Sequence, residues 1–195
     1  PLRSLLFVPA HRTTWVAKAI AVNPDAVVLD LEDSVPPDHQ AAARAALPQA
    51  YGELAAAGVA AVVRIHAMTE HSADEIAAVV RPGLAAVMLP KADNAGEIHA
   101  LHDLLSYHEG RNGMAHGSVA ILPLPETAAG LQNAESLAAA STRVKGICGT
   151  VSGPVTADVA RAFGFRASMQ GVEQYYMNSK LVLDSRAGGA PYPIA

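Results

Sequence analysis

Aromatic residues, cysteine and positive charge are all scarce in this chain. Only 5% of its 195 residues are aromatic and its formal net charge is -4, so it lacks the stacking surface and the basic face that nucleic-acid binding needs. The single cysteine, Cys148, cannot form an internal disulfide and lies in an apolar run, which fits a reducing compartment. Apolar runs such as Ala26 to Leu29 are too short to cross a bilayer. We therefore expect a soluble, cytoplasmic protein with neither nucleic acid nor membrane as a partner.

Hydrophobic residues, by contrast, make up 51% of the chain, enough for one buried core, and we expect a single domain over residues 1–195. Short β-rich runs alternate with helix-length segments, which is typical of βαβ units around a parallel sheet. Most runs are apolar at consecutive positions, as in parallel strands covered on both faces. The predicted strands are Leu5 to Val8, Ala26 to Leu31, Ala60 to Ile65, Ala85 to Leu89, Val119 to Leu122, Val144 to Cys148 and a weak run at Tyr192 to Ile194.

The segments between these runs are rich in alanine, leucine and charged residues, which favours helices. The predicted helices are Thr13 to Val22, Asp38 to Ala57, Ser72 to Val80, Asn94 to Tyr107, Thr127 to Ala140 and Gly171 to Gly188. Ser72 and Glu75 predict a capping box, and Thr127 predicts an N-cap. The glycine-rich segment Glu109 to Ser118 predicts a loop.

Two architectures satisfy this alternation, an open doubly wound sheet and a closed (β/α)8 barrel, the TIM-barrel fold. A nucleotide-binding doubly wound sheet usually has a glycine fingerprint after its first strand, whereas here that strand continues into Val8-Pro9-Ala10-His11-Arg12. The α/β class therefore follows from the pattern, and the missing fingerprint favours the barrel.

Polar or charged residues follow nearly every predicted strand. In a (β/α)8 barrel the carboxyl ends of the strands converge on one mouth, where the active site lies. We therefore expect these residues to form a site. They are His11 and Arg12, then Asp30, Glu32 and Asp33, then Arg64, Lys91, Glu126 and Asp158.

Several motifs follow one another along almost the whole chain. They are Arg3-Ser-Leu-Leu-Phe-Val-Pro-Ala-His-Arg12, Ala26-Val-Val-Leu-Asp-Leu-Glu-Asp-Ser-Val35, Val63-Arg64-Ile65-His66, Leu89-Pro90-Lys91, Leu124-Pro125-Glu126-Thr127-Ala128-Ala129-Gly130 and Ser179-Lys180-Leu-Val-Leu-Asp-Ser-Arg186-Ala187. In this order, the motifs resemble those of the citrate lyase beta-subunit-like family of the HpcH/HpaI aldolase superfamily. Any one of them is weak alone, but together they are specific.

The resemblance implies that Glu126 and an aspartate after the sixth strand bind Mg2+. Carboxylates are the hard ligands that Mg2+ prefers, and the cation can polarise a carbonyl and hold a developing enolate. The resemblance also implies that Arg64 contacts the substrate, and we assign Arg64 to the transition state rather than to folding because its charged fork matches a carboxylate or enolate oxygen.

The other predicted site residues also follow the predicted strands. Glu32 and Asp33 join Arg64 as predicted catalytic residues that order metal-bound water or neighbouring basic groups. Arg12 and Lys91 join Arg64 as predicted substrate-binding residues.

Two departures from the family pattern concern the site. His66 stands where the family usually has asparagine, which changes the hydrogen-bonding capacity after the arginine. For the metal aspartate, an alignment from the upstream side places Ser152 at the ligand position, whereas an alignment from the downstream side fits Asp158-Val-Ala-Arg-Ala-Phe-Gly164 with extra loop residues before it. We prefer the second alignment, so Asp158 is the predicted ligand.

The function implied is Mg2+-dependent carbon–carbon lyase activity on a 3-hydroxyacyl-CoA thioester of the citryl-, malyl- or citramalyl-CoA type, by retro-Claisen or aldol cleavage. Three alternatives stay open: a pyruvate-type aldolase on a free oxo or hydroxy acid, an acyl-CoA thioesterase, and a non-catalytic barrel that has lost its metal site. The family also implies a homo-oligomer, a trimer or a hexamer. Because a closed barrel needs eight strands and only seven runs are found, we expect an eighth strand and at least one further helix beyond Ala195.

Overall fold

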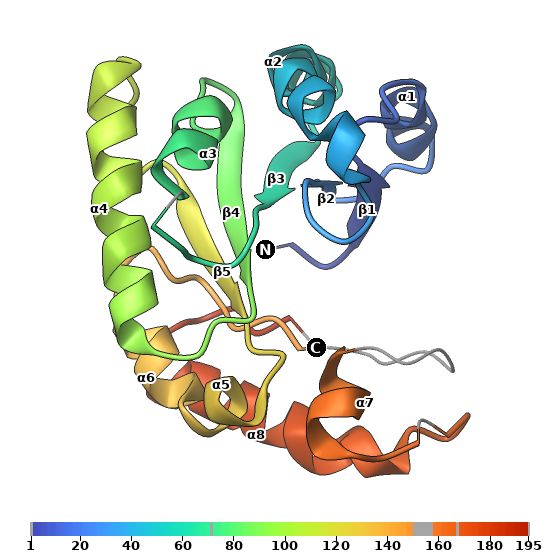
Figure 1. Ribbon diagram of the computed structural model, residues 1–195, viewed down its shortest axis with the longest axis vertical. Helices are drawn as coiled ribbons and strands as arrows, with labels where there is room; N and C mark the ends of the chain where they lie inside the picture. The colour runs from blue at the N-terminus through green and yellow to red at the C-terminus, as the bar shows by residue number, and fades with distance from the viewer. Residues whose placement is uncertain (1, 71, 150–157, 167, 195) are drawn as a thin grey trace. The chain divides into compact units, whose positions relative to one another are not determined.

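Five parallel strands in sequential order form the sheet of this α/β protein (Figure 1). The computed structural model describes residues 2–70, 72–149, 158–166 and 168–194. The strands are β1 (Leu5–Pro9), β2 (Ala26–Asp30), β3 (Ala60–Arg64), β4 (Leu84–Pro90) and β5 (Ala120–Leu124), ordered β1-β2-β3-β4-β5. A doubly wound sheet reverses its strand order part-way, whereas a barrel does not, so this sequential order matches the barrel alternative. The first five predicted strands are confirmed.

The chain divides into two compact units, each made of two chain segments. The first unit, residues 1–88 and 103–120, contains β1 to β3 and most of β4. The pairing of β2 with β3 runs from Ala26 opposite Ala60 to Asp30 opposite Arg64, and all five residues of β2 are buried. This register places the acidic Asp30 beside the basic Arg64 at the carboxyl ends of two neighbouring strands.

Helices α1 (Thr14–Ala21), α2 (Gln40–Ala56) and α3 (Ser72–Val79) also belong to the first unit, with a 3-10 turn, η1 (Pro37–His39), leading into α2. Helix α1 packs against α2 beside β1 to β3 (Figure 1). Leucines of α2 and the β-branched residues of the strands fill the core between them, which explains the near-continuous apolar strand runs in the sequence.

The second unit, residues 89–102 and 121–195, contains most of β5 and the C-terminal helices. These are α5 (Ala128–Gln132), α6 (Ala134–Ala139), α7 (Asp158–Phe163), the 3-10 turn η2 (Val172–Gln174) and α8 (Tyr175–Ala187). Helix α6 packs against α8, and α5 packs against α7. None of the helices in the described part of the chain is long and apolar enough to span a membrane.

Helix α4 (Ala95–Arg111) extends past the predicted end at Tyr107, so the predicted loop from Glu109 was placed too early. The reason is the Glu109 side chain, which is fully buried. Its carboxylate accepts hydrogen bonds of 2.8 Å from the backbone N–H groups of Gly117 and Val119. A buried carboxylate that caps its own following loop leaves no apolar periodicity for a sequence pattern to detect.

The sixth and seventh predicted strands were wrong as regular strands in the described residues. They make isolated parallel bridges instead, between Ile121 and Val144 and between Cys148 and Ile194. A β-carbon at Gly146 would lie 1.8 Å from the carbonyl oxygen of Tyr192, so the close approach of the two segments needs a glycine at this position. Glycine in a strand marks such a close approach of another backbone and weakens the strand.

Two helix-cap predictions had opposite outcomes. The Thr127 side chain accepts a hydrogen bond of 3.0 Å from the Gly130 N–H, which confirms the N-cap, although the predicted helix after it is divided into α5 and α6. The capping box of Ser72 and Glu75 was wrong, because the Glu75 carboxylate accepts from the His66 backbone N–H and lies 2.8 Å from His66 Nδ1. Glu75 therefore contacts His66 instead of forming the predicted cap with Ser72.

Candidate functional site

The predicted catalytic residue Arg64 lies within 4 Å of three carboxylates in the first unit. Its Nε and Nη2 each donate a hydrogen bond of 2.7 Å to the Asp30 carboxylate. Its Nη1 lies 3.3 Å from Glu32 Oε2 and 3.9 Å from Asp33 Oδ2. The structure thus brings together the three predicted catalytic residues, and it adds Asp30 as the strongest partner of the arginine.

Burial and charge act against each other in this cluster. Burial by itself raises the pKa of Asp30, but the hydrogen bonds from Arg64 and Ser34 and the positive charge of Arg64 outweigh it, so the Asp30 pKa lies below its usual value. Burial likewise lowers the pKa of Arg64, and Asp30 reverses the effect, so that pKa lies above its usual value. The pair therefore stays ionised, and Arg64 also stacks over the Phe7 ring at 5.3 Å.

The predicted metal ligands Glu126 and Asp158 lie in the second unit, and both contact Lys91. The Lys91 backbone N–H donates to Glu126 Oε2 at 3.2 Å, and Lys91 Nζ lies 3.5 Å from Asp158 Oδ2. Asp158 is the first residue of α7 and also pairs with Arg161. Lys91 has a left-handed backbone with φ of 51°, a conformation that is costly for a residue with a side chain and that recurs at functional sites.

The donor set of Glu126 and Asp158 fits Mg2+. Both groups are hard carboxylates, and Mg2+ typically takes one or two protein carboxylates and completes its shell with water and substrate oxygens. In residues 2–70, 72–149, 158–166 and 168–194, no cluster of three or more histidine, cysteine, aspartate or glutamate side chains is arranged to hold a metal, so a cage made of protein ligands alone is not found there. Ser152, the alternative ligand position, lies outside the described residues.

Neighbouring residues of the second unit give Glu126 a rigid and buried setting. Glu126 itself is only 6% exposed. Thr127, the next residue, donates a hydrogen bond to Asp93, and Asn133 donates to the Asp93 carbonyl oxygen at 2.9 Å. Burial, followed by the negative charge of Glu126, raises the pKa of the Cys148 thiol to about 12, so Cys148 is a packed residue rather than a nucleophile.

The predicted substrate-binding residue Arg12 lies on the surface of the first unit. Its backbone N–H donates to the Pro9 carbonyl oxygen at 2.8 Å, and its guanidinium lies 6.0 Å from the centre of the Trp15 ring. Arg12 thus follows β1 in a tight turn and keeps its charge in solvent.

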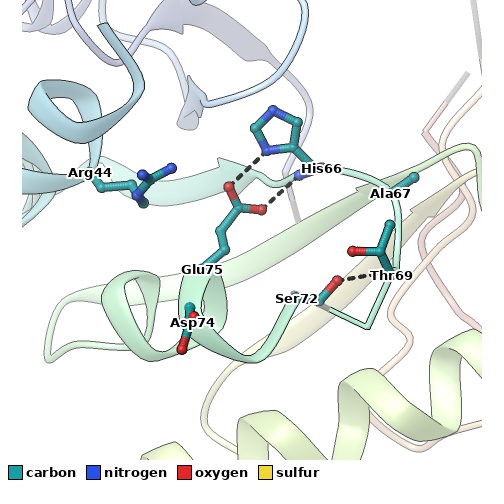
Figure 2. Close-up of a pocket in the computed structure, with 7 residues that line it drawn as sticks. All are labelled: Arg44, His66, Ala67, Thr69, Ser72, Asp74 and Glu75. Atoms are coloured by element: carbon teal, nitrogen blue, oxygen red, sulfur yellow. Dashed lines mark hydrogen bonds and ion pairs between the residues drawn. The ribbon is translucent and has the colours of Figure 1, made fainter. Parts of the chain in front are cut away.

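A cavity of about 350 Å3 opens beside the loop that follows β3 (Figure 2). Its lining includes Arg44 from α2 and His66, which follows Arg64 by two residues. Glu75 extends from α3 toward His66, accepts a hydrogen bond from the His66 backbone N–H and lies 2.8 Å from the ring nitrogen Nδ1 (Figure 2). The cavity therefore combines a permanent positive charge with an imidazole that a carboxylate holds in place.

Sequence reasoning missed two partners, Asp30 for Arg64 and Glu75 for His66. Asp30 could have been found, because the parallel strands β2 and β3 both end at these residues and their ends must meet. Glu75 gave no such signal, since its partner lies nine positions away across a loop and its spacing from Ser72 predicted a local cap instead.

The similarity of the chain to known protein families identifies the family to which it belongs. Residues 3–192 match the family model described as HpcH/HpaI aldolase/citrate lyase. The chain belongs to the HpcH/HpaI aldolase/citrate lyase family. The motifs in the sequence had indicated this family, and that prediction is confirmed.

Relatives within the family include lyases and thioesterases. The chain is 31% identical over 197 residues to a citrate lyase subunit beta-like protein of Deinococcus radiodurans, covering 96% of this chain and 63% of the relative. It is 32% identical over 183 residues to an L-malyl-CoA/beta-methylmalyl-CoA lyase of Cereibacter sphaeroides (91% and 56%). It is 29% identical over 140 residues to a (3S)-malyl-CoA thioesterase of the same species (71% and 45%). The chain thus spans less than two thirds of the length of these relatives.

Solved structures of the citrate lyase beta subunit from Mycobacterium tuberculosis have the same fold. One, complexed with oxaloacetate and magnesium, aligns with a TM-score of 0.69 at 28% identity, covering 95% of this chain and 74% of that chain. Another, in complex with magnesium, acetoacetate and coenzyme A, aligns with a TM-score of 0.66 at 28% identity, covering 95% and 62%. This family member therefore binds magnesium together with oxo acids and coenzyme A.

Proposed function

We propose that this chain is the active-site portion of a Mg2+-dependent carbon–carbon lyase that cleaves a 3-hydroxyacyl-CoA thioester of the citryl-, malyl- or citramalyl-CoA type. The observation that supports the proposal is that Lys91 contacts both hard carboxylates, Glu126 through its backbone N–H and Asp158 through its Nζ. Magnesium in complexes of a related citrate lyase beta subunit supports the identity of the metal. Coenzyme A in another of those complexes supports a thioester substrate.

Glu126 and Asp158 are the proposed Mg2+ ligands, and when bound the cation would polarise the carbonyl oxygen at which negative charge develops. Lys91 neutralises Asp158 and directs its backbone N–H at Glu126, so it orients both carboxylates. It is also a proposed substrate-binding residue, together with the exposed Arg12. Any anionic substrate would meet a positive charge at each of these residues.

Arg64 is the proposed donor to the enolate oxygen, and its contacts indicate which nitrogen donates. Asp30 occupies Nε and Nη2 at 2.7 Å each, whereas Nη1 is only loosely held by Glu32 at 3.3 Å. Nη1 is therefore the group that can exchange its partner for a substrate oxygen. Glu32 and Asp33 keep the guanidinium charged and oriented until that exchange.

We further propose that the chain folds as part of a (β/α)8 barrel domain, and that the protein is a homo-oligomer. The sequential order of the five parallel strands supports the barrel. The similarity of the chain to barrel enzymes of the same family supports the closed barrel and the homo-oligomer.

The test is a panel of acyl-CoA thioesters incubated with and without Mg2+, with both products quantified. A lyase releases an oxo acid and a shorter acyl-CoA only when Mg2+ is present. Titration calorimetry tests the ligands, because Glu126→Ala and Asp158→Ala should each abolish most Mg2+ binding. Full affinity in Asp158→Ala, together with tighter binding in Ser152→Asp, would assign the ligand position to residue 152.

Thioester hydrolysis is the second candidate, favoured by the similarity to a (3S)-malyl-CoA thioesterase. The same panel separates the two reactions, since hydrolysis releases free coenzyme A, whose thiol a colorimetric thiol reagent detects. Free thiol in equal amount to substrate consumed would replace the lyase proposal with the hydrolase.

A further inference from the structure

We infer that His66 is a proton-transferring catalytic residue and that Glu75 is its positioning residue. The inference rests on the proposed lyase function, which requires a base for the substrate hydroxyl. Arg64 is the last residue of β3, and only the fully buried Ile65 separates it from His66. The groups proposed to hold the enolate oxygen and to take the hydroxyl proton thus come from one strand end.

The hydrogen bonds of Glu75 determine which nitrogen of His66 carries the proton. One carboxylate oxygen accepts from the His66 backbone N–H at 2.9 Å, and the other lies 2.8 Å from Nδ1. An ionised carboxylate can only accept, so Nδ1 must carry a hydrogen. In the neutral ring, Nε2 then has the free lone pair, which is the form that a general base needs.

The side chains of Glu75 and His66 differ in their exposure to solvent. The Glu75 side chain is 12% exposed, whereas the His66 side chain is 45% exposed. The carboxylate is therefore shielded and fixed, while the imidazole remains accessible to a substrate. A shielded acid behind an accessible imidazole is the arrangement by which enzymes hold a histidine in one tautomer and stabilise its charged form.

The cavity beside the pair supplies space and charge for an anionic substrate. It holds about 350 Å3 and is lined by Arg44 and by the hydroxyl residues Thr69 and Ser72 (Figure 2). Arg44 carries a permanent positive charge that suits a carboxylate of the substrate. Asp74 also lines the cavity, so the charged residues of its described lining include Arg44, Asp74 and Glu75.

The proposed step balances its protons and electrons. His66 Nε2 takes the proton of the 3-hydroxyl group, the C2–C3 bond breaks, and a carbonyl forms at C3. The electron pair of the broken bond passes into the thioester enolate. The imidazolium, paired with Glu75, then returns the proton to the enolate carbon, which yields the oxo acid and the shorter acyl-CoA.

The decisive variant is His66→Asn, because its side-chain amide can still donate to Glu75 and keep the loop in place, yet it cannot accept a proton in catalysis. We expect kcat to fall by about 10²-fold or more, the contribution of a general base, with little change in melting temperature. Glu75→Gln should lower kcat by a smaller factor and change the acid limb of the kcat/KM pH profile. His99→Asn, an exposed histidine on α4, is the matched control and should keep its rate.

Nitrogen-15 NMR of the histidine rings tests the dyad without any activity measurement. Wild type should show the Nδ1–H tautomer at His66, and Glu75→Gln should reduce the population of that tautomer. A near-wild-type kcat in His66→Asn, or an Nε2–H tautomer in wild type, would overturn the inference. If wild type itself cleaves no thioester, the lyase proposal fails and the catalytic role of His66 fails with it, whereas an active wild type with an unaffected His66→Asn variant removes His66 alone.

Discussion

Asp30 and Arg64, at the ends of adjacent strands, form a two-point ion pair in which both hydrogen bonds measure 2.7 Å. The Asp30 side chain is 2% exposed and that of Arg64 is 12% exposed. Such a buried pair contributes to folding as well as to chemistry, because removing either partner leaves a charge out of water without its counter-ion. The assignment of Arg64 to the transition state alone is therefore too narrow.

Breaking this pair should lower both stability and activity. We expect Asp30→Asn to reduce the free energy of unfolding by about 3 kcal/mol or more, the scale of an uncompensated buried charge. Arg64→Lys should cost about 1–3 kcal/mol through lost hydrogen bonds and should lower kcat by roughly 10²-fold. Urea denaturation and steady-state kinetics measure the two effects.

Asp33→Asn is the control for these variants, since Asp33 is 60% exposed and lies 3.9 Å from Arg64. Exposed pairs are worth about 0–1 kcal/mol, so its stability should stay near that of wild type. A melting temperature unchanged in Arg64→Lys would restore the purely catalytic assignment.

Stability should fall as the solution is acidified through the range below pH 4. The folded-state pKa of Asp30 lies below its usual value, because the hydrogen bonds from Arg64 and Ser34 and the Arg64 charge outweigh the effect of burial. The unfolded chain then binds more protons, so the contribution is fully present above the unfolded pKa of about 3.9 and is lost as pH falls through the folded value. Thermal unfolding at a series of acidic pH values measures this slope.

Asp30→Asn should flatten that slope, and Asp25→Asn provides the comparison. Hydrogen bonds from the side chain and backbone of Arg3 also lower the pKa of Asp25, but the side chain of Arg3 is 81% exposed. High salt should therefore weaken the Asp25 contribution and leave that of Asp30 largely intact. Equal salt sensitivity of the two variants would contradict the burial of the Asp30 pair.

Cys148 should be inert in the folded protein. Burial raises its pKa to about 12, with the negative charge of Glu126 as the second cause, so almost no thiolate exists near pH 8. We expect a colorimetric thiol reagent to react only after denaturant is added. Rapid labelling of the native protein would show that the segment around Cys148 opens readily.

Gly146→Ala should disrupt the bridge between the segments around Cys148 and Ile194. The new β-carbon would lie 1.8 Å from the Tyr192 carbonyl oxygen, so the backbone must move, at a cost of about 1–3 kcal/mol or more. Gly52→Ala in α2 is the control, because no atom lies within 4 Å of its new β-carbon and alanine favours a helix. Hydrogen exchange at the Ile194 N–H, which donates to the Ile147 carbonyl oxygen, should rise only in Gly146→Ala.

The sequence by itself determined the α/β class, the first five strands, most helices and the family. These follow from local signals, namely apolar runs of strand length, alanine-rich segments between them, and motifs whose residues are close together in the chain. The polar residues at the strand ends could also be predicted, because parallel strands bring their carboxyl ends to the same edge. The Thr127 cap was of the same kind, since its partner Gly130 is three positions away.

Only the tertiary structure decided the partners of those polar residues. Asp30 binds Arg64, which the sequence analysis had assigned to the substrate. Glu75 contacts His66 instead of capping its own helix. Lys91 reaches Glu126 through its backbone and Asp158 through its side chain, which no spacing predicts. The physical reason is that a carboxylate binds whichever donor the fold brings to it in a buried setting, and local periodicity does not reveal a donor nine or more residues away.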